Sequence, residues 1–432
     1  MAHLSLGRRL GFGIFGLGEN FAVCFMNFWA FRYLSAAEDL PPVWVFAVLM
    51  AGRLWGAAAA PVAGHVSDRT LSRRGRRRPY LLFGTIPLFL SLGFFFMGPV
   101  FTGFRLNLVR IAAAVLVFNT ALALIAVPYS ALTPELSASY HEKTSLNGFR
   151  FTFAQAGTLL GILAVEPALR WFSSIPFLPG AGWLLTGLVA GAFASLTVLA
   201  VFFAVREKDL SRNAFPGPGF FSGCRETFSN RPYVRLLGAY TFQITGLTLF
   251  QILLGRCAEY AYRLPCPGFI APLALFLPAL VFTPVSVLVS RRAGKKRTCQ
   301  LCFLILAASS VFSLFLGFFG VPVFLGLLAC TGMGMGFGYA LPYSMIADTV
   351  EFDAVKSEER KEGIYYGVWA LVSSLGVSLA FFLAGLVPGL APGTRLVMGS
   401  VPALMFAAAA LCIRRYSLGE NTYRKIMGAG LS

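Results

Sequence analysis

Twelve apolar stretches, each long enough to cross a lipid bilayer, constrain this chain more than any other feature. The first six lie at about residues 11–35, 42–66, 80–101, 107–134, 147–170 and 181–204. The last six lie at about residues 233–256, 264–290, 298–319, 321–347, 364–388 and 394–415. A transmembrane helix needs about 20 predominantly apolar residues, so twelve spans and short connections fill the 432 residues. We therefore predict an all-α integral membrane protein.

The composition agrees with this class. Only 12% of the residues are charged, whereas soluble domains have about 25%. The net charge of +18 would suggest nucleic acid in a soluble protein, but here the Lys and Arg residues lie between apolar stretches. They are better interpreted as topology signals and lipid-headgroup contacts. We expect membrane lipids, and no nucleic acid, as partners.

The Lys and Arg residues also predict the orientation. With both termini placed in the cytoplasm, most of the 36 lie on inner segments. Six lie outside and two within spans: Arg32, Arg105, Arg170, Arg256, Arg263 and Arg395 outside, and Arg53 and Arg110 within. Because cytoplasmic connections carry the excess of positive charge, we predict a multi-pass cell-membrane protein with cytoplasmic termini. The short connections favour a bacterial inner membrane.

The two halves of the chain resemble each other at matching spans. Spans four and ten end in similar strings, Pro128-Tyr129-Ser130 and Pro342-Tyr343-Ser344. Spans two and eight both end in Pro-Val strings followed by a basic loop that contains glycine. This repeat predicts the major facilitator fold, in which the substrate binds between two six-helix halves related by a pseudo-two-fold axis. The predicted parts are residues 1–205, a cytoplasmic linker at 206–232, residues 233–415 and a cytoplasmic tail at 416–432.

The loop after span two places Asp68 and Arg69 shortly before Gly75-Arg76-Arg77-Arg78. A carboxylate at a helix end among several guanidiniums can form charge-assisted hydrogen bonds that open and close with a gate. The alternative is a plain positive-inside loop; the spacing favours a gate of Asp68, Arg69, Arg76 and Arg77.

Three segments resemble the signature segments of a known family: this loop, residues 127–136, and residues 347–353 with Lys361-Glu362-Gly363. The family is the glycoside–pentoside–hexuronide:cation symporters (melibiose-carrier-like) of the major facilitator superfamily, and the resemblance covers nearly the whole chain. It implies a secondary active transporter that takes up a small sugar or glycoside with Na⁺, H⁺ or Li⁺ by alternating access.

The chain departs from that family where the family binds its cation. The family pattern Arg-x-Trp-Asp-x-x-x-Asp-Pro reads Arg53-Leu-Trp-Gly56-Ala-Ala-Ala-Ala60-Pro here. Na⁺ needs oxygen ligands, and Gly56 and Ala60 supply none from their side chains. Other family site residues are also replaced, at Asn20, Ala126, Ser130 and Ser374, whereas the resemblance retains Arg150 and Tyr339 as substrate-binding candidates. We therefore expect no metal site, and transport that is H⁺-coupled or uncoupled.

Charged residues within spans are costly and are functional candidates by default. Glu19, beside Asn20, and Arg53 and Arg150 are the candidates here. Glu19 either pairs with Arg53 as a static link or takes up a proton as the coupling group, because burial raises a carboxyl pKa and a nearby arginine lowers it. Both alternatives stay open at this point.

Further candidates lie on the C-terminal half. Asp348, Glu351 and Asp353 end span ten, and we predict that they face residues 73–78 in a gate; the alternative is a solvated charged loop. Tyr339 and Trp369 belong to an aromatic group that can stack on a sugar.

Other functions were weighed against a sugar carrier. The apolar centre at residues 56–60 also suits a lysolipid or other amphipathic solute. The missing cation ligands would fit a transport-dead sensor, but the gate segments argue against it. The inner loops hold no arrangement for metal-assisted chemistry, so we predict neither an enzyme nor a cofactor. We expect a monomer; a disulfide between Cys257 and Cys266 stays open.

Overall fold

The computed structural model describes most of the chain and confirms the predicted membrane fold class. The described residues are 4–36, 41–70, 72, 75–101, 103–137, 139–176, 180–205, 207, 219–262, 264, 267–357, 359, 361–387, 392–420 and 422–423. Within them, twelve helical stretches are long and apolar enough to cross a membrane.

Six spans come from the first half of the chain. The first runs through α1 (Leu6–Cys24), a π-helical turn η1 (Phe25–Trp29) and α2 (Ala30–Ala36). The others are α3 (Pro42–Arg69), α4 (Arg78–Phe95), α5 (Phe104–Leu136), α6 (Tyr140–Leu163) and α8 (Gly182–Ala204), with the short α7 (Val165–Ser173) after α6.

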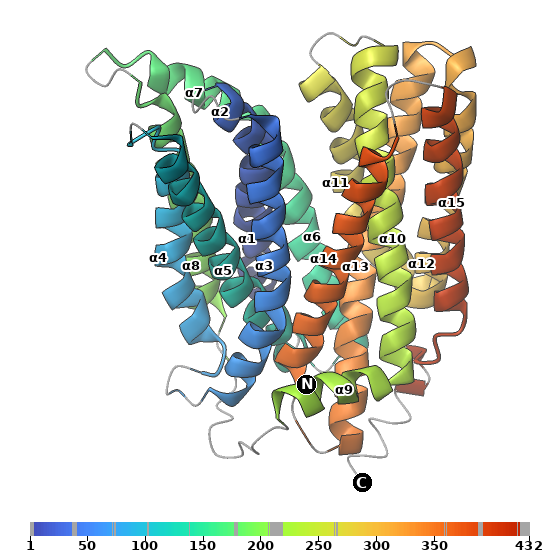
Figure 1. The fold of residues 1–432 in the computed structure, drawn as a ribbon. Coiled ribbons are helices and arrows are strands. Elements are labelled where there is room, and N and C mark those ends of the chain that lie inside the picture. The colour runs from blue at the N-terminus through green and yellow to red at the C-terminus, as the bar shows by residue number, and fades with distance from the viewer. Residues whose placement is uncertain are drawn as a thin grey trace.

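The second half supplies the other six. They are α10 (Arg231–Arg256), α11 (Pro267–Ala293), α12 (Lys295–Phe312), α13 (Val321–Ser357), α14 (Glu362–Gly385) and α15 (Pro392–Arg414). Two short turns, η3 (Cys257–Ala261) and η4 (Ser313–Phe318), extend α10 and α12. The helix α9 (Phe220–Ser229) lies within the predicted linker and crosses the lower end of the molecule in Figure 1.

The two sets of spans form two groups of helices that meet near one end of the molecule (Figure 1). The backbone N–H of Leu4 donates to Glu142 at 2.7 Å, and Lys143 Nζ donates to the Tyr423 hydroxyl at 3.0 Å. Both terminal segments therefore contact the start of α6. We call this end of the bundle the terminal face.

Two helices begin or end several residues away from the predicted bounds. α6 begins at Tyr140 rather than about residue 147, and α13 continues to Ser357 rather than about residue 347. The added turns carry charged side chains, among them Lys143 and Asp348, and these pair with each other. Because a hydropathy pattern stops at the first charges, it ends such helices too early.

Glycines allow the two groups to touch at the terminal face. A Cβ atom on Gly64 of α3 would lie 2.1 Å from the carbonyl oxygen of Gly363 in α14. A Cβ on Gly367 would lie 2.5 Å from Cα of Pro61. Small residues permit this backbone contact between membrane helices, so at these two points α3 and α14 meet with no side chain between them.

This crossing makes the first prediction. Gly64→Ala should lower the melting temperature of the purified protein, because overpacking a tight contact costs about 1–3 kcal/mol. Gly326→Ala on α13 is the matched control, since its Cβ would meet no atom within 4 Å. Equal melting temperatures for the two variants would contradict the tight crossing.

Candidate functional site

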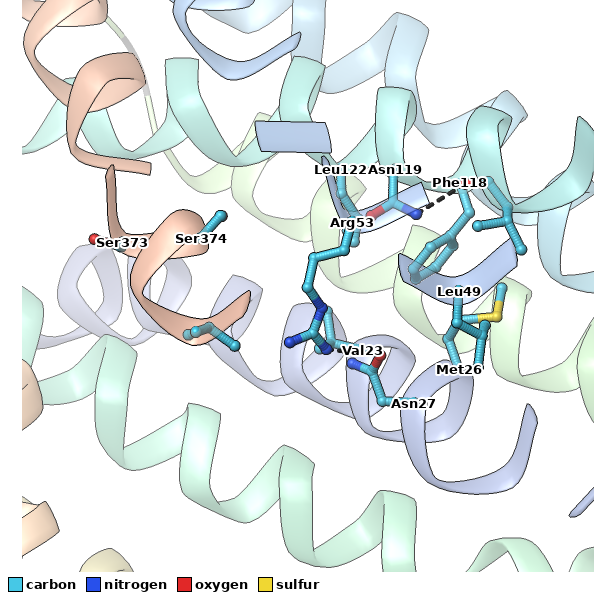
Figure 2. Close-up of a pocket in the computed structure, with 12 residues that line it drawn as sticks. Val23, Met26, Asn27, Leu49, Arg53, Phe118, Asn119, Leu122, Ser373 and Ser374 are labelled. Atoms are coloured by element: carbon cyan, nitrogen blue, oxygen red, sulfur yellow. Dashed lines mark hydrogen bonds between the residues drawn. The ribbon is translucent and has the colours of Figure 1, made fainter. Parts of the chain in front are cut away.

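A cavity of about 280 Å³ lies between the two groups of helices. Its wall comes from α1 and η1, α3 and α5 on one side and from α14 on the other (Figure 2). The apolar lining is Val23, Met26, Leu49, Val115, Phe118, Leu122 and Val377, and the polar lining is Asn27, Arg53, Asn119, Ser373 and Ser374. We call it the central cavity; both groups of helices are needed to form it.

Arg53 is the charged side chain among the residues that line the central cavity. Its Nη2 atom donates to Oδ1 of Asn27 at 3.2 Å, and Figure 2 shows the side chain extending toward Asn27. Its guanidinium carbon lies 4.9 Å from the ring centre of Phe381 in α14. The possible static pair with Glu19 is therefore not formed.

Glu19 pairs instead with Arg150. The Nη2 atom of Arg150 lies 3.3 Å from a Glu19 carboxylate oxygen, and its Nη1 atom donates to Ser130 at 2.9 Å. The Arg150 guanidinium also lies over the rings of Tyr129 and Tyr343, at 4.8 and 5.1 Å. Since Tyr343 belongs to α13, this pair lies where the two groups of helices meet.

The other predicted binding residues have packing contacts. Asn20 donates to the carbonyl of Gly16 in its own helix at 3.1 Å. Tyr339 stacks on Phe151 with ring centres 5.9 Å apart, across the two groups. Trp369 is buried and stacks on Tyr240 at 4.5 Å, so the lining of the central cavity does not include it.

An ionic cluster joins the two groups at the terminal face; we call it the Arg77 cluster. Its members are Asp68, Arg76, Arg77, Glu135 and Glu362. Arg77, 0% exposed, contacts Asp68 at 2.9 Å, Glu135 at 2.8 Å and Glu362 of α14 at 3.2 Å. Burial lowers the pKa of Arg77, but the charges of Glu135, Asp68 and Glu362 outweigh it and raise the pKa above its ordinary value. The guanidinium therefore stays charged.

Asp68 also binds the beginning of α14 directly. Its two carboxylate oxygens accept the backbone N–H groups of Gly363 at 2.9 Å and Ile364 at 3.0 Å. A carboxylate at a helix N-terminus satisfies free N–H groups and complements the helix dipole. Arg69, predicted beside it in the gate, is exposed at the end of α3.

Glu207 holds the loop of this cluster in place. Its carboxylate accepts the backbone N–H groups of Arg76, Arg77 and Arg78 at 2.6, 2.9 and 2.7 Å. Burial, and then the nearby charge of Glu135, raise the pKa of Glu207. The start of α4 and the two residues before it are thereby fixed to Glu207, which follows the end of α8.

A second ionic cluster, the Asp348 cluster, consists of Lys143, Lys295, Asp348 and Glu351. Lys295 lies 2.6 Å from Asp348, and Lys143 of α6 lies 3.4 Å from it and also pairs with Glu351. Asp348 and Glu351 were predicted to face residues 73–78. This is wrong for the described Arg76 and Arg77, which belong to the Arg77 cluster and do not pair with Asp348 or Glu351. Arg73 and Arg74 lie outside the described residues.

The internal repeat explains why Asp348 pairs with a different basic loop from the one predicted. The basic loop after span two meets the end of span four through Glu135, and the basic loop after span eight meets the end of span ten through Asp348. In each half, an acidic side chain therefore neutralises positive charge of the basic loop of that same half. The opposite half then adds one side chain to each cluster, Glu362 to the first and Lys143 to the second.

Several of these residues were not singled out from the sequence. Asn27, Asn119 and Ser373 are uncharged, so the sequence gave no signal for them. Glu135 and Glu362 lie within the quoted family segments and could have been found.

The two positions where the resembled family binds its cation are packed against other groups. Gly56 faces Asn119, and Ala60 is buried at the crossing of α3 and α14. The described residues hold no group of three His, Cys, Asp or Glu side chains fit for a metal ion. Cys266 lies outside the described residues, so its pairing with Cys257 is not addressed.

Comparison with known proteins agrees with this architecture. A family model described as MFS/sugar transport protein matches residues 11–420. An uncharacterised symporter of Synechocystis sp. is 26% identical, over 85% of this chain and 82% of its own. The sphingosine-1-phosphate transporter MFSD2B of Mus musculus is 27% identical, over 81% and 73%. The sodium-dependent lysophosphatidylcholine symporter 1-A of Danio rerio is 24% identical, over 87% and 77%.

Solved structures show the same fold. The transporter FucP in its outward conformation superposes with a TM-score of 0.71 at 12% identity, covering 95% of this chain and 98% of that one. The proton:xylose symporter XylE superposes with a TM-score of 0.66 at 14% identity, covering 96% of each chain.

The Arg77 cluster makes the second prediction. Arg77→Met should destabilise the protein by about 3–5 kcal/mol, because it leaves buried carboxylates without their partner. Arg292→Met is the matched control, since Arg292 is exposed at the end of α11. Thermal unfolding of both variants checks this, and an unchanged Arg77→Met would show that the buried charges do not depend on Arg77.

Proposed function

Since the chain belongs to the MFS/sugar transport protein family, whose relatives here include symporters, we propose that it carries an amphipathic organic solute across the membrane by alternating access. The chain is a transporter rather than an enzyme. One observation carries the mechanism: a cavity formed by both groups of helices is closed at the terminal face by two ionic clusters that join those groups.

The geometry supports a rocking movement of two halves, residues 1–205 and 233–415, with residues 206–232 as linker and the tail after residue 415. We assign the terminal face to the cytoplasm of a cell membrane, because most of the Lys and Arg residues in the described part of the chain lie on that side. The described conformation is then closed to the cytoplasm. Opening it requires Asp68 to release α14 and both clusters to separate. Since one chain forms the whole cavity, a monomer suffices.

The lining of the central cavity favours an amphipathic solute over a plain sugar. Seven of its twelve lining side chains are apolar, and a sugar needs a dense set of hydrogen-bond partners. Two kinds of relatives, by their names, carry a sphingosine phosphate and lysophosphatidylcholine. A sugar or glycoside is the second candidate, supported by the stacked Tyr339 and Phe151 near Arg150.

Coupling to H⁺ is better supported than coupling to Na⁺. Gly56 and Ala60 offer no carboxylate, and Glu19 is an ionisable group that meets Arg150 where the two halves join. Protonation of Glu19 would release Arg150 and change the contact with Tyr343. This makes Glu19 the proposed coupling residue, with an uncoupled carrier as the alternative.

A ligand screen tests the proposed function. The protein in lipid nanodiscs is screened by thermal shift against glucose, hexyl glucoside and lysophosphatidylcholine, with and without Na⁺ and at two pH values. An amphipathic ligand that binds the folded protein should raise its free energy of unfolding by about 2.7 kcal/mol at 100 times the Kd. The melting temperature should rise as a result. Hits are then tested for uptake into proteoliposomes. No stabilisation and no uptake with the whole panel would contradict the proposal.

Glu19→Gln tests the coupling. A pH gradient should no longer drive solute accumulation above the equilibrium level, while exchange of solute across the membrane continues, because only the titrating group is removed. Glu166→Gln is the matched control, as Glu166 pairs with Arg32 and Arg170 at the opposite end of the bundle. Accumulation that keeps its pH dependence in Glu19→Gln rules out the proton role.

A further inference from the structure

We infer that the Arg53 guanidinium is the receptor for an anionic group, so that the solute of the central cavity is an organic anion with an apolar body. This inference rests on the proposed function and narrows its substrate class. It assigns Arg53 a specificity role through charge, whereas the proposed function requires only that the cavity bind and release a solute.

The first ground is the charge of the cavity. Among the described residues, Arg53 has no carboxylate within ion-pair distance; its polar partner is the neutral amide of Asn27 at 3.2 Å. The Phe381 ring, at 4.9 Å, adds a weak cation–π contact. A cation inside a membrane protein is costly unless it is paired. The central cavity thus carries one positive charge that no carboxylate of the described residues neutralises.

Arg53 differs in this respect from two other arginines within the bundle. Arg150 is paired with Glu19, and Arg77 contacts three carboxylates. An anion arriving at either of them would have to displace a carboxylate already in place. At Arg53 it displaces none, so an incoming anion gains a charge-assisted interaction without that cost.

The second ground is the set of free hydrogen-bond donors. A guanidinium has five N–H donors in a fork that suits carboxylate and phosphate oxygens, and Asn27 accepts from one nitrogen of Arg53. An anionic oxygen in the central cavity would engage N–H groups of Arg53 that Asn27 does not use.

The third ground is the apolar surface around Arg53. Val23, Met26, Leu49 and Phe118 line the cavity with it. These side chains give an apolar body a place in the central cavity beside an anionic group bound at Arg53. Phe28, the residue after Asn27, instead lines a second cavity of about 500 Å³, whose lining includes Gln251 and Glu259.

The experiment changes the charge at one position without changing its shape. Asn27→Asp is nearly isosteric and places a carboxylate beside Arg53; Asn27→Ala removes the amide and adds no charge. Binding of hexyl phosphate and of neutral hexyl glucoside is measured by thermal shift of full-length protein in phosphatidylcholine nanodiscs. Asn27→Asp should weaken hexyl phosphate binding by about tenfold or more, equivalent to about 1.4 kcal/mol. Asn27→Ala should retain it, and hexyl glucoside should respond alike to both variants.

Two further readouts separate binding from folding. Without ligand, Asn27→Asp should melt at or above the wild-type temperature, because the new carboxylate neutralises Arg53. Arg53→Gln should lose the preference for hexyl phosphate over hexyl glucoside, and Arg53→Lys should keep part of it.

The outcomes distinguish this inference from the proposed function. If hexyl phosphate does not stabilise the wild type, or stabilises Asn27→Asp equally well, the inference is overturned. Uptake of a neutral solute in that case leaves the proposed function intact. If no solute, charged or neutral, binds or enters proteoliposomes, the proposed function itself fails.

Discussion

A buried guanidinium, that of Arg77, lies at the centre of the larger of the two ionic clusters that close the terminal face. Arg77 is fully buried and contacts carboxylates from α3, α5 and α14, so it neutralises charges that come from both halves of the chain. Because the cost of separating such charges in a low-dielectric interior is large, the two groups of helices are held together at this end. Midway along the bundle, the same two groups of helices leave room for the central cavity. A cavity that is closed at one end is what an alternating-access carrier needs in each of its end states.

The two ionic clusters use corresponding elements of the repeat with different charges. Each combines a basic loop, the end of the following long span and the start of a helix from the opposite half. In the Arg77 cluster the opposite half contributes an acid, Glu362, and in the Asp348 cluster it contributes a base, Lys143. The repeated backbone therefore sets where the two clusters lie. The sequence of each half decides whether the side chain that it adds to the other half's cluster is acidic or basic.

Much of the fold could be predicted because hydropathy and repeated Pro-Tyr-Ser strings are local signals. The candidate site was harder to predict for reasons of geometry. The sequence offered Arg53 as the static partner of Glu19, and the pair with Arg150 that forms instead depends on how α1 and α6 pack. Asp348 was assigned to the wrong basic loop because charge patterns do not say which loop folds back on which span. Asn27 and Ser373 are ordinary polar residues, and their place in the lining of the central cavity is visible only in three dimensions.

The bond between Asp68 and α14 has a consequence for how this contact can be traced through evolution. Asp68 binds backbone N–H groups of Gly363 and Ile364, not side chains, and every residue except proline supplies such a group. A change of side chain at Ile364 therefore leaves its bond to Asp68 in place, and correlated changes between homologous sequences would not link these two residues. At Gly363 a Cβ would lie 2.8 Å from Oδ1 of Asp68, so this position has to stay small. Gly363 would instead vary with Gly64, whose backbone it touches. The closest link between the halves would thus be recorded in sequence families as a pair of small residues rather than as a charge.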